Sequence, residues 1–169
     1  VTHHRSENLC ISSSLGAQDG KSASLAVDEL EGLFDYILLD KTAPDRCDSA
    51  IIVTEPFVPS VKSSDACKAY LSDMGIKDIS LIVNKLNGGQ IINGEVMTAQ
   101  EIAALLRLPL KAVIPEDLTL PLGKWKKSTL KAFRAAAETV SGKREIVCNV
   151  VKPYFGLNGY IKRKVRERL

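Results

Sequence analysis

The side chains best suited to chemistry follow apolar runs of the chain. Asp40 ends "FDYILLD", Asn84 ends "LIVN", and Pro115, Glu116 and Asp117 end "VIPED". A carboxylate after a buried strand can hold Mg²⁺ through water, an amide offers a donor and an acceptor to a purine edge, and a proline-stiffened loop can flank a flat base. Asp and Asn also start turns, and acidic residues suit the first turn of a helix. For each of these residues taken alone, a role in ligand binding and a structural role in a turn or helix start both stay open.

A glycine-rich stretch, "LGAQDGKSAS" at residues 15–24, is similar to a phosphate-binding loop. That signature needs four residues between its first Gly and the Gly-Lys-Ser/Thr, so that backbone N–H groups can wrap a phosphate. Only Ala17, Gln18 and Asp19 intervene here, and the carboxylate of Asp19 opposes an anion. The stretch therefore predicts a polar turn.

Five apolar runs bounded by polar residues must position these side chains. Their lengths and Ile/Val content are typical of strands buried on both faces, as in parallel sheets covered by helices. Ligands in such sheets bind beyond the carboxyl ends of the strands, where Asp40, Asn84 and Pro115 stand. The five predicted strands cover residues 9–12, 36–40, 50–54, 79–84 and 110–115.

Three helical patterns lie between and after these runs. One spans residues 60–74 and ends at Gly75, a left-handed cap. The second begins with a Thr98 to Glu101 capping box and stops before Pro109. The third spans 127–141 and is followed by Gly142. Expected buried stripes are Val61, Ala66, Tyr70 and Leu71 in the first helix, and Leu130, Phe133, Ala137 and Val140 in the third. The pattern predicts a layered α/β domain with a mostly parallel sheet flanked by helices.

Composition limits the class of protein. With 169 residues, 45% apolar and 25% charged, the chain is long enough for one domain with a hydrophobic core. No apolar run approaches the length of a membrane span, and the N-terminus is too polar for a signal peptide, so we expect a cytoplasmic protein. Four scattered cysteines without a C-x-x-C pair argue against a zinc site or a disulfide framework.

The basic charge is concentrated at the C-terminus. Residues 157–169 carry five basic side chains against one acidic, a local charge of +4 within a net +3. On a helix, Leu157, Ile161, Val165 and Leu169 share one face, which suits an anionic membrane interface. Docking of this face on the domain is an equal alternative, and nucleic acid is disfavoured because no reading motif is present. The candidate membrane-binding residues are Tyr160, Ile161, Lys162, Arg163, Lys164, Val165, Arg166, Arg168 and Leu169. We expect a boundary that divides the chain into a domain at 1–152 and a tail at 153–169.

Four segments in order carry a resemblance to a known family. "FDYILLD", "SAIIVTEPFVPSVKSSDACKAYLSDMGI", "LIVNKLN" and "TAQEIAALLRLPLKAVIPED" together resemble the C-terminal half of the MinD/ParA family of P-loop ATPases, on the MinD side. The match covers roughly residues 33–135. The resemblance implies that Asp40 is the Mg²⁺-linked Asp, Asn84 the adenine-reading Asn, and Pro115 through Asp117 the loop on the base. It also implies ATP and Mg²⁺ as cofactors of the intact family, a homodimer, and a short membrane-targeting helix at the end.

Two departures from the family limit the expected activity. Nothing here matches the Walker A phosphate loop of the family's first strand, and only "KTAPDRCD" separates the strand of Asp40 from the next. Phosphate contacts supply most of the binding free energy for ATP. We therefore expect this chain alone neither to bind ATP tightly nor to hydrolyse it. The resemblance predicts a truncated or degenerate MinD-like protein that positions cell-division or polar machinery, on the cytoplasmic side and at the inner face of the plasma membrane. The alternative is a non-catalytic interaction module with an unidentified protein partner.

Overall fold

The computed structural model describes residues 2–6, 9–13, 27–40, 46–143 and 147–154. The chain divides into two compact units, Val1–Cys47 and Asp48–Leu169. In the first unit, β1 (Thr2–Ser6) and β2 (Leu9–Ser13) pair as an antiparallel hairpin. The boundary expected between residues 152 and 153 stays a prediction.

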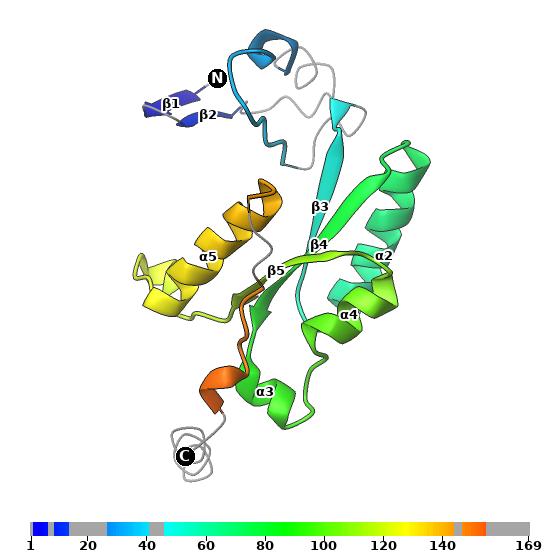
Figure 1. Cartoon of the computed structure of the whole chain (residues 1–169), viewed down its shortest axis with the longest axis vertical. Coiled ribbons are helices and arrows are strands. Elements are labelled where there is room, and N and C mark those ends of the chain that lie inside the picture. Colours follow the sequence, from blue (N-terminus) through cyan, green and yellow to red (C-terminus); the bar gives the residue numbers. More distant parts are fainter. Residues whose placement is uncertain (1, 7–8, 14–26, 41–45, 144–146, 155–169) are drawn as a thin grey trace. The chain divides into compact units, whose positions relative to one another are not determined.

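A parallel sheet forms the centre of the second unit (Figure 1). Its strands are β3 (Ser49–Thr54), β4 (Asp78–Leu86) and β5 (Leu110–Pro115), hydrogen-bonded in the order β3-β4-β5. β-branched and apolar side chains dominate all three, as expected for buried strands. The strands predicted at 50–54, 79–84 and 110–115 are confirmed, and so is the layered α/β class.

Helices α2 (Val58–Asp73) and α4 (Ala99–Leu106) cover one face of the sheet, while the five-residue α3 (Gly88–Ile92) follows β4 (Figure 1). Leu81 and Ile102 are fully buried, and Leu106 is nearly so. The predicted caps are confirmed, because Thr98 and Glu101 form a capping box and Gly75 has a φ of +89°. The predicted stripe of the first helix is only partly right: Val61 is buried, whereas Tyr70 is exposed.

Helix α5 (Lys127–Val140) packs against β5 on the opposite face of the sheet (Figure 1). Ala132 and Ala136 meet Ala112 and Ile114 there, with Ile82 beside them. The buried face of α5 consists of small residues, Thr129, Ala132, Ala135, Ala136 and Thr139. The predicted buried stripe is therefore wrong: Leu130 and Phe133 are each 41% exposed and Val140 is 37% exposed. Small side chains let the helix approach the sheet closely, and the larger ones stay partly exposed. The 3₁₀ turn η2 (Leu120–Leu122) precedes α5 in the chain, and η3 (Lys152–Tyr154) contacts α3.

Two strand predictions in the first unit need correction. Residues 36–40 form no strand, and Tyr36 and Leu38 are 63% and 85% exposed. An apolar run forms a strand only where a neighbouring strand accepts its hydrogen bonds, and in the described structure none pairs with this one. Residues 9–12 are a strand as predicted, but they belong to the antiparallel hairpin and not to the parallel sheet.

Candidate functional site at the carboxyl edge of the sheet

The loop after β3 is held by one serine at the start of α2. The hydroxyl of Ser60 lies 3.0 Å from the hydroxyl of the buried Thr54 and accepts the backbone N–H of Glu55 at 3.0 Å. The carboxylate of Glu55 in turn accepts from the ammonium group of Lys85 at 2.5 Å, joining the ends of β3 and β4. Both of these charged side chains are partly exposed, so the ion pair orients them more than it stabilises the fold.

Asn84 is half-buried near the end of β4. Its Oδ1 accepts the backbone N–H of Lys85 at 2.9 Å, and Lys85 has a φ of 54°, in the left-handed region. This turn is rare for a residue with a side chain, and the amide of Asn84 stabilises it. Among the described residues, the Nδ2 group of Asn84 has no hydrogen-bond partner, so a donor and part of an acceptor remain available at this edge.

Asn87 connects the ends of β4 and β5. Its Oδ1 caps α3 by accepting the N–H groups of Gly89 and Gln90, while its Nδ2 donates to the Glu116 carboxylate at 2.7 Å. The backbone N–H of Glu116 donates to the carbonyl of Leu86 at 3.1 Å. The loop at Pro115 to Asp117 is thereby fixed to the strand that carries Asn84.

Asp117 ties the same loop to the start of α5. One carboxylate oxygen accepts from the backbone N–H and the hydroxyl of Thr119, at 3.0 and 2.6 Å, and lies 3.3 Å from the ammonium group of Lys126. The other oxygen accepts from the hydroxyl of Thr129 at 2.7 Å and the backbone N–H of Lys126 at 3.2 Å. The side chain of Asp117 is completely buried. Its charge also faces the positive end of the helix dipole.

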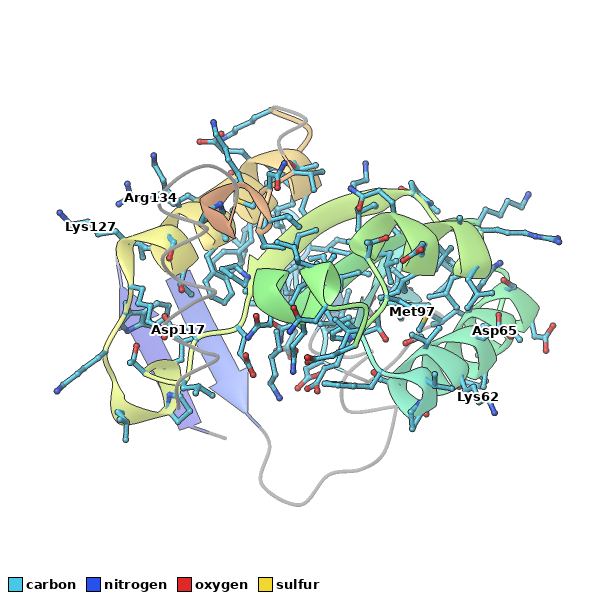
Figure 2. The ribbon with its side chains drawn as sticks, turned by 90° about the horizontal axis from the view of Figure 1, so that it is seen from below. Lys62, Asp65, Met97, Asp117, Lys127 and Arg134 are labelled. Atoms are coloured by element: carbon cyan, nitrogen blue, oxygen red, sulfur yellow. The ribbon has the colours of Figure 1, made fainter. Side chains whose placement is uncertain are left out.

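These donors change the acidity of Asp117. The hydroxyls of Thr119 and Thr129, followed by the N–H groups of Thr119 and Lys126, hold its pKa well below the ordinary range, and burial opposes them only in part. The carboxylate is thus ionised and saturated with protein donors. Asp117 therefore positions the loop that contains Pro115. Figure 2 shows Asp117 with Lys127 and Arg134 on the α5 side, away from Met97, Lys62 and Asp65.

Within the second unit, the structure brings part of the predicted site together. Asn84 and Pro115 to Asp117 share the carboxyl edge of neighbouring strands, whereas Asp40 lies in an exposed bend of the first unit. In the described residues no group of three or more His, Cys, Asp or Glu could hold a metal ion. The glycine-rich stretch at 15–24 and the candidate tail from Tyr160 to Leu169 lie outside the described residues.

Sequence reasoning missed several residues at this edge. Ser60, Asn87, Thr119 and Thr129 hold the loops in place, and the Asp-x-Thr spacing at 117–119 is a turn signature that could have revealed one of them. It also missed an open pocket of about 470 Å³ between the start of α2 and the loop before α4, whose lining includes Phe57, Ile91 and Met97. Neither Asn84 nor the loop at 115–117 lines this pocket.

The arrangement of the sheet places the chain in a class of solved folds. It superimposes on the MinD cell division protein of Aquifex aeolicus with a TM-score of 0.70 at 23% identity, over 77% of this chain and 64% of that one. The same organism's MinC:MinD complex gives a TM-score of 0.69 at 22% identity, over 78% of this chain and 62% of that one. No family model matches the sequence. The fold of the second unit is therefore that of these MinD structures.

Sequence relatives agree with this class. A putative septum site-determining protein MinD of Oltmannsiellopsis viridis is 31% identical over 140 residues, covering 72% of this chain and 44% of its own length. The chloroplastic minD homolog of Arabidopsis thaliana is 32% identical over 111 residues, covering 58% of this chain and 34% of its own length. The chain belongs to the MinD/ParA family, as the four ordered motifs predict. It spans about half the length, or less, of the curated relatives that it matches.

Proposed function

We propose that this chain acts in spatial positioning of cell-division or polar machinery, as the names of its septum site-determining relatives suggest. Support comes from sequence relatives and solved structures that carry MinD names. Because the chain spans only part of those proteins, their complete activity is a proposal here. The more specific parts of the proposal are a sheet edge that reads a base, weak affinity for nucleotide and a C-terminal tail that binds membrane.

The single observation that carries the nucleotide proposal is the available amide of Asn84 beside a fixed loop. Asn84 Nδ2 and the open lone pair of its Oδ1 would meet the donor and acceptor edge of adenine. Pro115 would flank the base, while Glu116 and Asp117 hold the loop through Asn87 and Thr129. When bound, ATP would bring the triphosphate that provides most of the binding energy in related sites.

The described residues fit the base better than they fit the phosphates or Mg²⁺. Asp40 is a single exposed carboxylate, and the described part of the chain offers no cluster of metal ligands to support it. A magnesium ion held through one carboxylate depends on phosphate oxygens for its other ligands. We therefore propose that the chain alone binds ATP weakly and does not hydrolyse it.

Calorimetry on the purified chain tests this proposal. We expect a dissociation constant for ATP on the order of 1 mM, corresponding to about 4 kcal/mol, with little change on adding Mg²⁺. Asn84→Ala should abolish this weak binding of ATP. Asn93→Ala, which removes an amide outside this edge of the sheet, should not. Tight binding that requires Mg²⁺ contradicts the proposal.

For the C-terminal tail we propose peripheral binding to an anionic membrane. No helix among the described residues has both the length and the apolar character needed to cross a bilayer. The support is the +4 charge and the four-residue spacing that would place Leu157, Ile161 and Val165 on one face of a helix, because basic amphipathic helices bind anionic interfaces. Sedimentation with liposomes tests it: binding should rise with anionic lipid, and binding that ignores lipid charge contradicts it. We propose the cytoplasm, at the inner face of the plasma membrane, with a plastid as the alternative suggested by the chloroplastic relative.

A second candidate function is a non-catalytic interaction module. The observation that favours it is the placement of Asp40 outside any described strand, since a catalytic metal site needs a fixed carboxylate. One solved neighbour is a complex of MinD with MinC, so a partner protein of that kind and a homodimer are both proposed. Restored ATP hydrolysis after adding the N-terminal half of a relative would favour the ATPase over the module.

A further inference from the structure

The segment between β5 and α5 is a loop closed at its base. The hydroxyl of Thr119 donates to the carbonyl of Lys124 at 3.0 Å, and the backbone N–H of Lys124 donates to the carbonyl of Thr119 at 3.1 Å. Gly123 ends the turn η2 with a φ of 70°. The carboxylate of Asp117 accepts the N–H groups of Thr119 and Lys126, near the two ends of the loop. Hydrogen bonds therefore fix the conformation of this loop.

The closed loop exposes large apolar side chains. Leu118, Leu122 and Trp125 are 76%, 73% and 59% exposed. Trp125 meets Phe133 of α5 edge-on, at a distance of 6.0 Å between the ring centroids, and this contact extends the apolar surface onto the helix. Apolar side chains gathered on one exposed surface mark an interaction site, whereas scattered ones need no explanation.

Basic side chains lie in the same stretch, and no acidic residue occurs at 118–137. Lys127, Lys131 and Arg134 share one face of α5, because they follow one another at helical spacing. Figure 2 shows Lys127 and Arg134 extending outward from the helix. Among the described residues, Lys126 alone of the basic residues here pairs with a carboxylate, that of Asp117. The five basic residues are Lys124, Lys126, Lys127, Lys131 and Arg134.

We propose that the loop and the basic face of α5, together called the 118–134 surface, bind an anionic lipid bilayer. Leu122 and Trp125 enter the interface between headgroups and acyl chains, while Lys124 and Lys127 contact lipid phosphates. Tryptophan suits this depth because its ring is apolar and its N–H is polar. Lysine stems lie along apolar surface while their ammonium groups reach the headgroups. The inference goes beyond the proposed function, because this contact requires neither the C-terminal tail nor nucleotide.

The residue types favour a bilayer over an acidic protein or a nucleic acid. Lysine is depleted in protein interfaces, where arginine and aromatic residues are enriched, yet four of the five basic residues here are lysines. A nucleic acid would stack its bases on the aromatic ring and would leave the two exposed leucines without an apolar partner. An anionic bilayer offers an apolar phase to Leu118 and Leu122 and negative charge to the lysines.

The fluorescence of Trp125 tests this proposal directly. Trp125 is the single tryptophan of the chain, so its emission reports the 118–134 surface and not the tail. The full chain is titrated with phosphatidylcholine vesicles that contain or lack phosphatidylglycerol. We expect the anionic vesicles to shift the emission to shorter wavelength, and brominated acyl chains to quench it. Neutral vesicles should do neither.

Two variants and a matched control test the residues. Leu122→Ser should weaken binding to anionic vesicles about tenfold, because it removes a side chain that enters the apolar phase. Lys127→Ala should weaken it about fivefold, because it removes one cation near the anionic surface. Leu105→Ser, at a residue 64% exposed on α4, is the control and should leave binding unchanged. Circular dichroism checks that each variant retains the fold.

Three results would overturn the proposal. One is an unchanged Trp125 emission with anionic vesicles; if the chain still sediments with them, the tail remains as the proposed membrane contact. Another is an equal response from Leu122→Ser and Leu105→Ser. The third is a larger emission shift with polyglutamate or duplex DNA than with vesicles of equal charge, which would identify a different anionic partner. None of these results depends on ATP, so they are separate from failure of the proposed nucleotide site.

Discussion

The two faces of the sheet are built differently. On the face of α2 and α4, large side chains such as Leu81, Val83 and Ile102 are fully buried. On the face of α5, alanines and threonines make the contact, and the larger Leu130 and Phe133 stay partly exposed. Within the described residues of the second unit, the first face is a closely packed core, whereas on the second face α5 packs against β5 and beside Ile82 of β4. The difference indicates that the α2 and α4 side contributes most of the stability of the second unit.

The largest effect is expected from truncating a fully buried side chain on the face of the sheet that α2 and α4 cover. Ile102→Ala should lower the free energy of unfolding by about 2–5 kcal/mol, because it removes a fully buried side chain and leaves a cavity. Urea denaturation followed by circular dichroism measures this change. A loss below about 1 kcal/mol would show that the α4 face is loosely packed and would remove the contrast between the faces.

A smaller effect, dependent on pH, is expected at the start of α5. The pKa of Asp117 is lowered in the folded protein, so its contribution to stability is present above the unfolded value of about 3.9 and is lost as pH falls through the folded value. Asp117→Asn should reduce the urea midpoint at pH 7 and flatten the loss of stability below about pH 4. Asp65→Asn, at an exposed position on α2, is the control. An unchanged acid profile in Asp117→Asn would contradict the assignment.

The capping box of α4 gives the next prediction. Thr98 accepts the N–H of Glu101 at 3.2 Å, and the Glu101 carboxylate accepts the N–H of Thr98 at 2.7 Å. Thr98→Ala should cost about 1 kcal/mol of unfolding free energy, whereas Thr98→Ser should retain most of it. Thermal or urea unfolding of the two variants distinguishes a working cap from an incidental contact.

The smallest effect is expected at an exposed valine of β3, compared with a buried valine of the neighbouring β4. Val53→Thr should change the free energy of unfolding by no more than about 0.5 kcal/mol, because Val53 is 58% exposed. The same substitution at the fully buried Val83 should cost about 1–3 kcal/mol, since it buries an added hydroxyl. Equal losses at the two positions would mean that the β3 face is covered in solution.

Local signals in the sequence predicted most of the second unit. Runs rich in Ile and Val predicted β3, β4 and β5, and the residues that follow them predicted the edge where Asn84 and Pro115 lie. The capping box and Gly142, with a φ of +70°, marked helix ends correctly. These features depend on neighbours in the chain, so a single sequence reveals them.

Features that depend on distant partners could not be predicted in the same way. Residues 36–40 have the composition of a strand but no described strand beside them. Hydrophobicity favoured Leu130 and Phe133 as the buried face of α5, whereas close packing on β5 selects alanine and threonine. The ties from Asp117 to Thr129 and from Asn87 to Glu116 span 12 and 29 residues. Such pairs emerge only when the strands are assembled.

Native-state hydrogen exchange on the dilute chain compares the closely packed α4 side of the sheet with β3, which pairs with β4 alone among the described strands. We expect slow exchange throughout β4 and on α4, with fast exchange for the β3 amides that do not pair with β4 in the described structure. Equal protection of β3 and β4 in the monomer would contradict this difference in stability between the two strands.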